Sequence, residues 1–192
     1  MARPRPAKPV KLIAGLLGGD VDLLRRARQK LAQEFGPVDL ESELWPFDRT
    51  DYYEAQMGPG LQRQFLSFAR LIRPDALAEI KCRTNRLEQQ IADDCQPLGY
   101  PRPVNIDPGY LDLAKLVLAT TKDRSHRVYL GEGIYAEVTL HYADGAWRPW
   151  PWTYPDYHKP EYHAFFARVR ACYRDQRAEL ERLMETAGDA PP

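Results

Sequence analysis

The sequence has no excess of charge of either sign, because Lys plus Arg and Asp plus Glu each number 27. A neutral chain lacks the broad basic surface that drives non-specific binding to nucleic acid or to membranes. Long apolar runs are also absent, and none approaches the roughly 18 residues that a membrane span needs. We therefore expect no membrane partner, and nucleic acid would have to use a local basic patch.

Cysteine is scarce, and Cys82, Cys95 and Cys172 stand far apart without forming a CxxC pair. An odd number of scattered cysteines predicts reduced thiols and not a disulfide framework. The N-terminal MARPRPAKP is basic but leads into only a short apolar run, which does not resemble a signal peptide. Together these features predict a cytoplasmic protein.

Several well-known motifs are missing as well. The four histidines form no HExxH or other zinc pattern. The sequence contains no GxGxxG fingerprint, no GxxxxGKS/T phosphate loop and no GxSxG nucleophile motif. Dinucleotide, P-loop and serine-hydrolase sites of the usual kind therefore have no support in the sequence.

What the chain does contain is enough apolar sequence for one domain, with 192 residues of which 44% are hydrophobic. Residues 1–9 carry three prolines and three basic residues, so we expect a flexible N-terminal arm. Residues 10–185 are predicted to form a single α+β domain, and residues 186–192 a frayed tail.

The first half of the chain reads as strand, helix, strand, strand, helix, strand. Strands are predicted at 10–17, 38–47, 61–72 and 104–106. One helix is capped by Asp20, and a second begins at Pro74. This order matches a ferredoxin-like βαββαβ core, in which an antiparallel-rich mixed sheet carries helices on one face.

The second half adds a hairpin and a C-terminal helix to this core. Asp107-Pro108-Gly109 is a strong turn signal that should close the strand at 104–106. Residues 112–121 fit either a helix capped by Asp112 or a buried strand, and we favour the helix. Gly131-Glu132-Gly133 predicts a hairpin, and Pro160 opens the last helix.

A long central stretch, NIDPGYLDLAKLVLATTKDRSHRVYLGEGIYAEVTL at residues 105–140, resembles the signature of domain of unknown function family 4416. The resemblance extends to VKLIAGLL near the start, to FDRTDYYEAQMG at 47–58 and to PWTYPDY at 151–157. It covers nearly the whole chain and implies a bacterial, cytoplasmic, single-domain protein. It carries over no activity, cofactor or catalytic residue.

The densest polar cluster is KDRSHR at residues 122–127, just before the predicted hairpin. Lys122 and Arg127 can donate charge-assisted hydrogen bonds to a phosphate or carboxylate. His126 is a candidate general base near neutral pH. The alternative is a solvated turn in which His126 is bonded to the surrounding structure.

Strand alternation places Arg127 and Tyr129 on one face of the hairpin, and Tyr135, Glu137 and Thr139 on one face of its second strand. A cross-strand ion pair between Arg127 and Glu137 is the structural interpretation of this pattern. A Glu137 carboxylate that holds a substrate or a metal is the functional one.

Asp107 is either the cap of a turn or a catalytic acid at the end of a strand. With Asp123 and Glu137 it offers oxygen ligands to a hard cation such as Mg²⁺, although no recognised metal spacing is present. The aromatic run of Trp147, Trp150, Trp152, Tyr154 and Tyr157 either stacks on bases or sugars or clamps a loop over the core.

From these residues we expect binding, with or without turnover, of a phosphate-bearing or other anionic small ligand or nucleotide. The predicted catalytic residues are Asp107, His126 and Glu137. The predicted ligand-binding residues are Lys122, Arg127, Tyr129, Tyr135, Trp152 and Tyr154. The alternative is a non-catalytic RNA- or protein-binding module that uses the aromatic segment 147–157.

Overall fold

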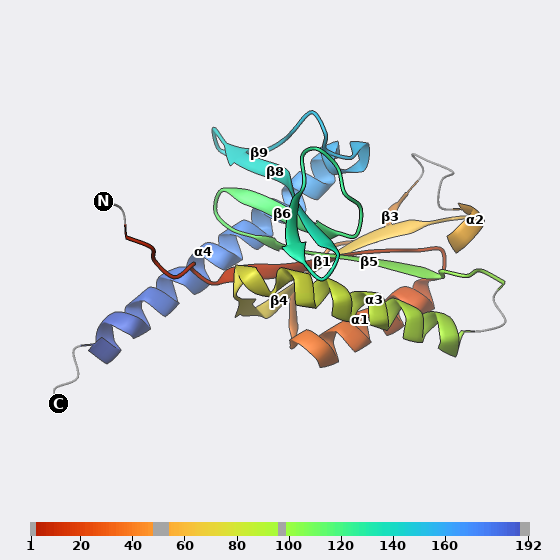
Figure 1. Cartoon of the computed structure of the whole chain (residues 1–192), viewed down its shortest axis with the longest axis horizontal. Helices are drawn as coiled ribbons and strands as arrows, with labels where there is room; N and C mark the ends of the chain where they lie inside the picture. Colours follow the sequence, from red (N-terminus) through yellow and green to blue (C-terminus); the bar gives the residue numbers. More distant parts are fainter. Residues whose placement is uncertain (1–2, 48–53, 96–98, 189–192) are drawn as a thin grey trace.

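The computed structural model describes residues 3–47, 54–95 and 99–188, and Figure 1 shows the chain in ribbon form. The chain is an α+β protein, as predicted, with one large antiparallel sheet between helices. Its elements, with η denoting a short 3-10 helix, follow one another as β1 (Val10–Gly18), α1 (Val21–Phe35), β2 (Val38–Glu41), β3 (Trp45–Pro46), α2 (Glu54–Met57), β4 (Gln62–Ile72), η2 (Pro74–Ala76), α3 (Leu77–Asp94), β5 (Val104–Leu111), β6 (Lys115–Thr120), β7 (Val128–Gly131), β8 (Ile134–Ala143), β9 (Ala146–Pro149), η3 (Pro155–His158) and α4 (Pro160–Gly188).

The sheet has the strand order β2-β4-β1-β5-β6-β8-β7, with β3 paired to β4 and β9 paired to β8. Each of these pairs is antiparallel. The order β2-β4-β1-β5, with α1 after β1 and α3 after β4, is compatible with the expected βαββαβ core. The ferredoxin-like assignment itself stays a prediction, because the same sheet continues through β6, β8 and β7.

One face of the sheet packs against α1 and α3. The apolar residues of β1 that point this way, such as Leu12 and Leu16, join Leu24 and Leu31 of α1 and Ile80 of α3 in one buried cluster. The start of α1 is fixed as predicted, since the Asp20 carboxylate accepts the backbone N–H of Asp22 at 2.7 Å. Burying each such side chain stabilises the fold by roughly 1.5–3 kcal/mol.

The opposite face is covered by α4, which differs from the expectation that helices lie on one face only. Ile13 of β1 and Phe65 of β4 meet Tyr162, Phe166 and Val169 of the helix in a second buried cluster. Figure 1 shows α1 and α3 below the central strands and α4 crossing above them. The molecule therefore has three layers, with the sheet in the middle.

The prediction of a helix at 112–121 was wrong, because Lys115–Thr120 is strand β6. Asp112 does not cap a helix. Its Oδ1 accepts the backbone N–H groups of Ala114 and Lys115, at 2.7 and 2.8 Å, and so closes a tight turn between β5 and β6. Leu116 and Val117 then enter the sheet as buried strand residues.

The predicted turn at Asp107-Pro108-Gly109 was also wrong, because these residues lie inside β5. On one side β5 pairs with β1 along its whole length, with Asp107 opposite Gly15. On the other side pairing with β6 begins only at Gly109. Pro108 is tolerated here because it lies where the β6 edge of β5 is unpaired.

Both ends of the described chain lie on the same side of the molecule, where the N-terminal segment contacts α4 (Figure 1). Lys8 forms an ion pair with Glu181 at 2.9 Å, and the Tyr173 hydroxyl donates to the Pro9 carbonyl at 2.7 Å. The helix α4 continues to Gly188, into the predicted tail. The division into arm, domain and tail stays a prediction.

Within the described part of the chain, no helix is both long enough and apolar enough to cross a membrane.

Candidate functional site

The centre of the candidate site is the carboxylate of Glu137 in β8. Its Oε2 accepts a hydrogen bond from Arg127 Nε at 2.9 Å and lies 3.1 Å from His126 Nε2. The predicted cross-strand ion pair between Arg127 and Glu137 is therefore present, and His126 joins it. Hairpin pairing explains this, because β7 follows directly after Arg127 and pairs with β8.

This pair of charges is almost fully removed from water. Glu137 is 3% exposed, and the side chain of Arg127 is also 3% exposed. Burial alone would lower the pKa of the Arg127 guanidinium, but its bonds to Tyr154 and Glu137 outweigh burial and raise it. Thr139 also lies at the site, with its hydroxyl 3.4 Å from the other carboxylate oxygen of Glu137. The carboxylate is thus held in one position by several donors.

Arg127 links Glu137 to two neighbouring loops. Its Nη1 donates to the carbonyl of Lys122 at 2.8 Å, and its Nη2 donates to the hydroxyl of Tyr154 at 3.3 Å. These bonds and the one to Glu137 engage all three nitrogens of the guanidinium. Arg127 is consequently committed to fixing the site and offers a ligand little free surface.

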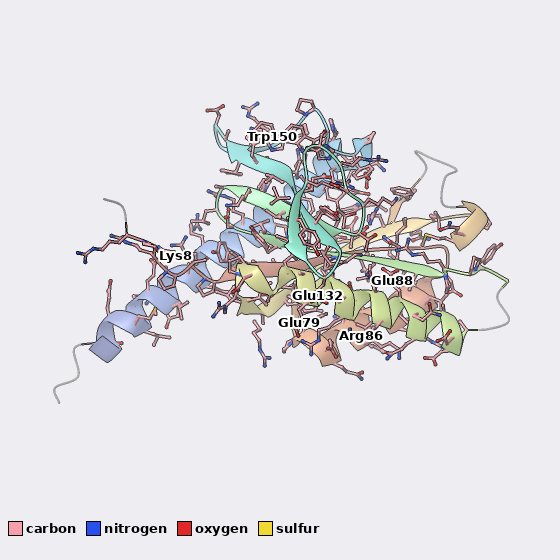
Figure 2. The ribbon with its side chains drawn as sticks, in the orientation of Figure 1. Lys8, Glu79, Arg86, Glu88, Glu132 and Trp150 are labelled. Carbon is pink, nitrogen blue, oxygen red and sulfur yellow. The ribbon has the colours of Figure 1, made fainter. Side chains whose placement is uncertain are left out.

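Four aromatic rings form a column beside this ion pair. His126 stacks on Trp152 with centroids 5.4 Å apart, and Trp152 stacks on Trp150 at 5.2 Å. Trp150 in turn lies 4.3 Å from the ring of His141, and Figure 2 shows it in the upper part of the molecule near β8 and β9. The indole N–H of Trp152 donates to the Val138 carbonyl at 3.1 Å. The aromatic segment thus clamps its loop onto β8.

The column limits what the tryptophans can bind. Trp152 stacks on both His126 and Trp150, and 38% of it is exposed. A base that took the place of either ring would have to displace it. The polar group that remains available is Nδ1 of His126, which makes no hydrogen bond within the described chain while Nε2 faces Glu137.

Tyr129 and Tyr135 lie beside this site on the hairpin. They occupy directly opposite positions in β7 and β8, with ring centroids 5.2 Å apart. The Tyr129 hydroxyl accepts the backbone N–H of Gly133 at 3.3 Å. Of the predicted ligand-binding residues, Arg127 thus contacts the Lys122 carbonyl and Tyr154, Trp152 stacks on His126, and Tyr129 and Tyr135 contact each other.

Asp107 does not belong to this cluster. It lies in β5, where its carboxylate is 3.4 Å from Arg63 Nη1 and 3.8 Å from Lys81 Nζ, and accepts a hydrogen bond from Asn105 at 2.7 Å. Burial opposes its ionisation, but the charges of Lys81 and Arg63 outweigh burial and lower the pKa of Asp107. A joint catalytic role with His126 and Glu137 has no contact to support it.

Asp107 belongs instead to a second polar cluster, centred on Arg63, whose buried polar residues the sequence did not point to. Arg63 is 5% exposed, and its Nη2 lies 3.5 Å from Asp156 in η3. Burial raises the pKa of Asp156 despite the charge of Arg63. The hydroxyls of Tyr157 and Tyr162 are buried without a hydrogen-bond partner in the part of the chain that the structure describes. The only sequence signal was an arginine on the buried face of an apolar strand.

The described residues contain no group of three or more His, Cys, Asp or Glu side chains that could hold a metal ion. Asp123 is exposed, and it forms no metal-binding group with Asp107 and Glu137 among the described residues. The oxygen ligands considered for Mg²⁺ are therefore not assembled into one site.

Comparison with known proteins now bears out the resemblance noted in the sequence. The model of the family described as Domain of unknown function (DUF4416) matches residues 8–173, and the chain belongs to this family. The match contains all residues of both clusters. Neither the curated proteins nor the solved structures give a match to the chain.

Proposed function

We propose that this member of the family binds a small anionic ligand at the loop of residues 122–127. The observation that carries the proposal is the buried Glu137 carboxylate, which holds Arg127 Nε and His126 Nε2 at 2.9 and 3.1 Å. This arrangement orients the imidazole, so that its Nδ1 is left for a ligand or a proton. A carboxylate that orients a histidine in this way is a common feature of functional sites.

The charge of the loop favours an anion. Residues 122–127 contain three basic residues and one acidic residue besides His126. Glu137 compensates the charge of Arg127 inside the fold, and we expect Lys122 and His126 to meet the ligand. Phosphate and carboxylate oxygens accept the charge-assisted hydrogen bonds that these side chains donate.

The aromatic column favours a small ligand over a nucleic-acid strand. A single-stranded nucleic acid is normally held by aromatic rings with a free face on which its bases stack. In this protein Trp152 already stacks on His126 and on Trp150. Residence in the cytoplasm, expected from the scattered cysteines, is part of the same proposal.

Isothermal titration calorimetry of the full chain with inorganic phosphate, AMP and ATP, each with and without Mg²⁺, tests the proposal. We expect one of these anions to bind, and Lys122→Ala and His126→Ala to weaken its binding by about tenfold or more, since each removes a charge-assisted contact of about 1.5–3 kcal/mol. The matched control is Lys30→Ala, which removes a lysine of α1 that is paired with Asp94 of α3. This variant should bind the anion as the wild type does.

Two results would count against the proposal. One is the absence of binding heat for every anion. The other is equal affinity of Lys122→Ala and Lys30→Ala for an anion that does bind. Binding of single-stranded RNA with loss of the histidine–indole contact would instead support the alternative of a nucleic-acid module.

A further inference from the structure

The strand β7 forms one edge of the sheet, and no strand in the described chain pairs with its outer side. Its three consecutive apolar residues are all exposed, with Val128 at 68%, Tyr129 at 60% and Leu130 at 42%. Val128 and Tyr129 are paired with Ala136 and Tyr135 of β8, whereas the register shifts at Leu130. An edge that combines free backbone N–H and C=O groups with exposed apolar side chains is a template for pairing with another strand.

The opposite edge of the sheet shows how such pairing is normally prevented. β2 carries Asp39 and Glu41, which are paired with Lys11 and Arg28. Charged side chains on an edge strand oppose the approach of another strand. β7 has no charged residue between Val128 and Gly131, so the two edges of this sheet differ in kind.

The charges at the two ends of β7 indicate which strand fits the edge. Arg124 precedes the strand and Glu132 follows it, and both side chains are exposed. Neither forms an ion pair or a hydrogen bond through its side chain with any described residue. Glu132 is labelled in Figure 2, at the surface end of the hairpin. The edge is therefore basic at its start and acidic at its end.

We propose that β7 is a self-association edge, at which a second copy of this chain adds its own β7 antiparallel to the first. An antiparallel arrangement brings the basic end of each strand to the acidic end of the other, so that Arg124 of each copy reaches Glu132 of the second copy. A two-fold axis makes both contacts equal, as in most homodimers. A parallel arrangement would place like charges together, and an unrelated peptide would have no reason to match both ends.

The expected dimer is weak. A strand of this length buries less surface than the roughly 1,200–2,000 Å² of a standard interface. The two sheets become one continuous sheet, in which Val128, Tyr129 and Leu130 gain cross-strand neighbours. The dimer rests on the strand edge and its end charges. Arg124 also belongs to the loop 122–127 of the proposed ligand site, but the test below measures mass and not ligand binding, so failure of one proposal is distinguishable from failure of the other.

Sedimentation velocity on the full chain, at concentrations from about 5 to 500 µM, tests the association. We expect a reversible shift toward twice the chain mass as the concentration rises, and slower amide hydrogen exchange at residues 128–130 over the same range. Val128→Lys should keep the chain monomeric. Val21→Lys changes another exposed valine, on α1, and should leave the dimer unchanged.

A charge exchange tests the antiparallel register. Arg124→Glu and Glu132→Arg alone each place like charges together and should raise the dimer dissociation constant on the order of tenfold. The double variant restores opposite charges and should recover the wild-type constant. Leu183→Lys, on the exposed end of α4, should have no effect.

Several outcomes would overturn the proposal. They are a wild-type chain that stays monomeric at every concentration, a Val128→Lys chain that still dimerises, and a double variant no better than the single ones. Dissociation by Leu183→Lys would assign the interface to α4 instead. Thermal unfolding of each variant establishes that it is folded before its mass is interpreted.

Discussion

At the scale of single residues, Glu137 is the side chain on which the candidate site depends most. Glu137→Gln keeps its shape but removes its charge, so the buried guanidinium of Arg127 is left without a counter-charge. Breaking a buried ion pair in this way costs about 3 kcal/mol. We expect the free energy of unfolding, measured by urea denaturation, to fall by about that amount.

Glu132→Gln is the control for this prediction, because Glu132 is exposed at the hairpin turn. Its replacement should change stability by less than about 0.5 kcal/mol. If both variants lost the same stability, the ion pair of Glu137 would have no special weight in the fold.

Asp107 leads to a prediction about pH. The charges of Lys81 and Arg63, acting against burial, lower the pKa of Asp107 below its usual 3.8. An acid with a depressed pKa stabilises the fold above its unfolded pKa, and this contribution disappears as the pH falls through its folded pKa. The difference in unfolding free energy between wild type and Asp107→Asn should be full at about pH 6 and shrink below about pH 4.

Unfolding by guanidinium chloride, measured at several pH values for the wild type and for Asp107→Asn, checks this expectation. Asp123→Asn, in the exposed loop before the hairpin, is the control and should change the free energy of unfolding by less than about 0.5 kcal/mol. A constant difference for Asp107→Asn down to about pH 3 would mean that its charge contributes nothing to stability.

Two ion pairs show which contacts between residues could be predicted from the sequence and which could not. The pair of Arg127 and Glu137 was predictable, because both residues lie on one short hairpin whose alternation is visible in the sequence. The partners of Asp107 were not, since Arg63 comes from β4 and Lys81 from α3. Contacts between distant elements require the sheet order, which the sequence alone does not supply.

At the scale of elements, the junction of β5 and β6 depends on Gly109. A Cβ at this position would lie 2.7 Å from Leu118 Cδ2 and would also overlap the Val117 carbonyl oxygen. Gly109→Ala must push the two strands apart, which costs about 1–3 kcal/mol. We expect a lower midpoint of urea unfolding, and an unchanged midpoint would show that the strands separate freely.

Elements with a clear start and stop were predicted well, and short apolar runs were not. Asp20 and Gly36 delimit α1 in the sequence and in the structure. Lys115–Thr120 has no such limits, and its apolar residues suit a helix as well as a strand. The segment forms a strand because Asp112 makes a turn before it and because it is buried in the sheet beside β8. Both are properties of the tertiary structure.

At the scale of the whole molecule, the two halves of α4 have different surroundings. Its first half contributes Tyr162, Phe166, Val169 and Tyr173 to the core, whereas Leu183 is exposed on the second half. Figure 1 shows the second half extending beyond the sheet. This asymmetry was not visible in the sequence, where Leu180 and Leu183 continue the same apolar pattern.

Deletion of residues 182–192 should therefore change the free energy of unfolding by less than about 1 kcal/mol, since surface changes cost little. Phe166→Ala, in the core half of the same helix, should cost about 3–5 kcal/mol. Thermal or urea unfolding distinguishes the two. A truncated chain as unstable as Phe166→Ala would show that the projecting half supports the fold.

The aromatic column has one more consequence, which concerns light and not binding energy. The fluorescence of an indole depends on the protonation and position of an imidazole stacked on it, and His126 and His141 lie at the two ends of the paired indoles of Trp152 and Trp150. A ligand that draws His126 toward itself should change the emission of the chain. Trp152→Phe should abolish that change, so the protein carries its own fluorescent reporter at the site where we expect an anion.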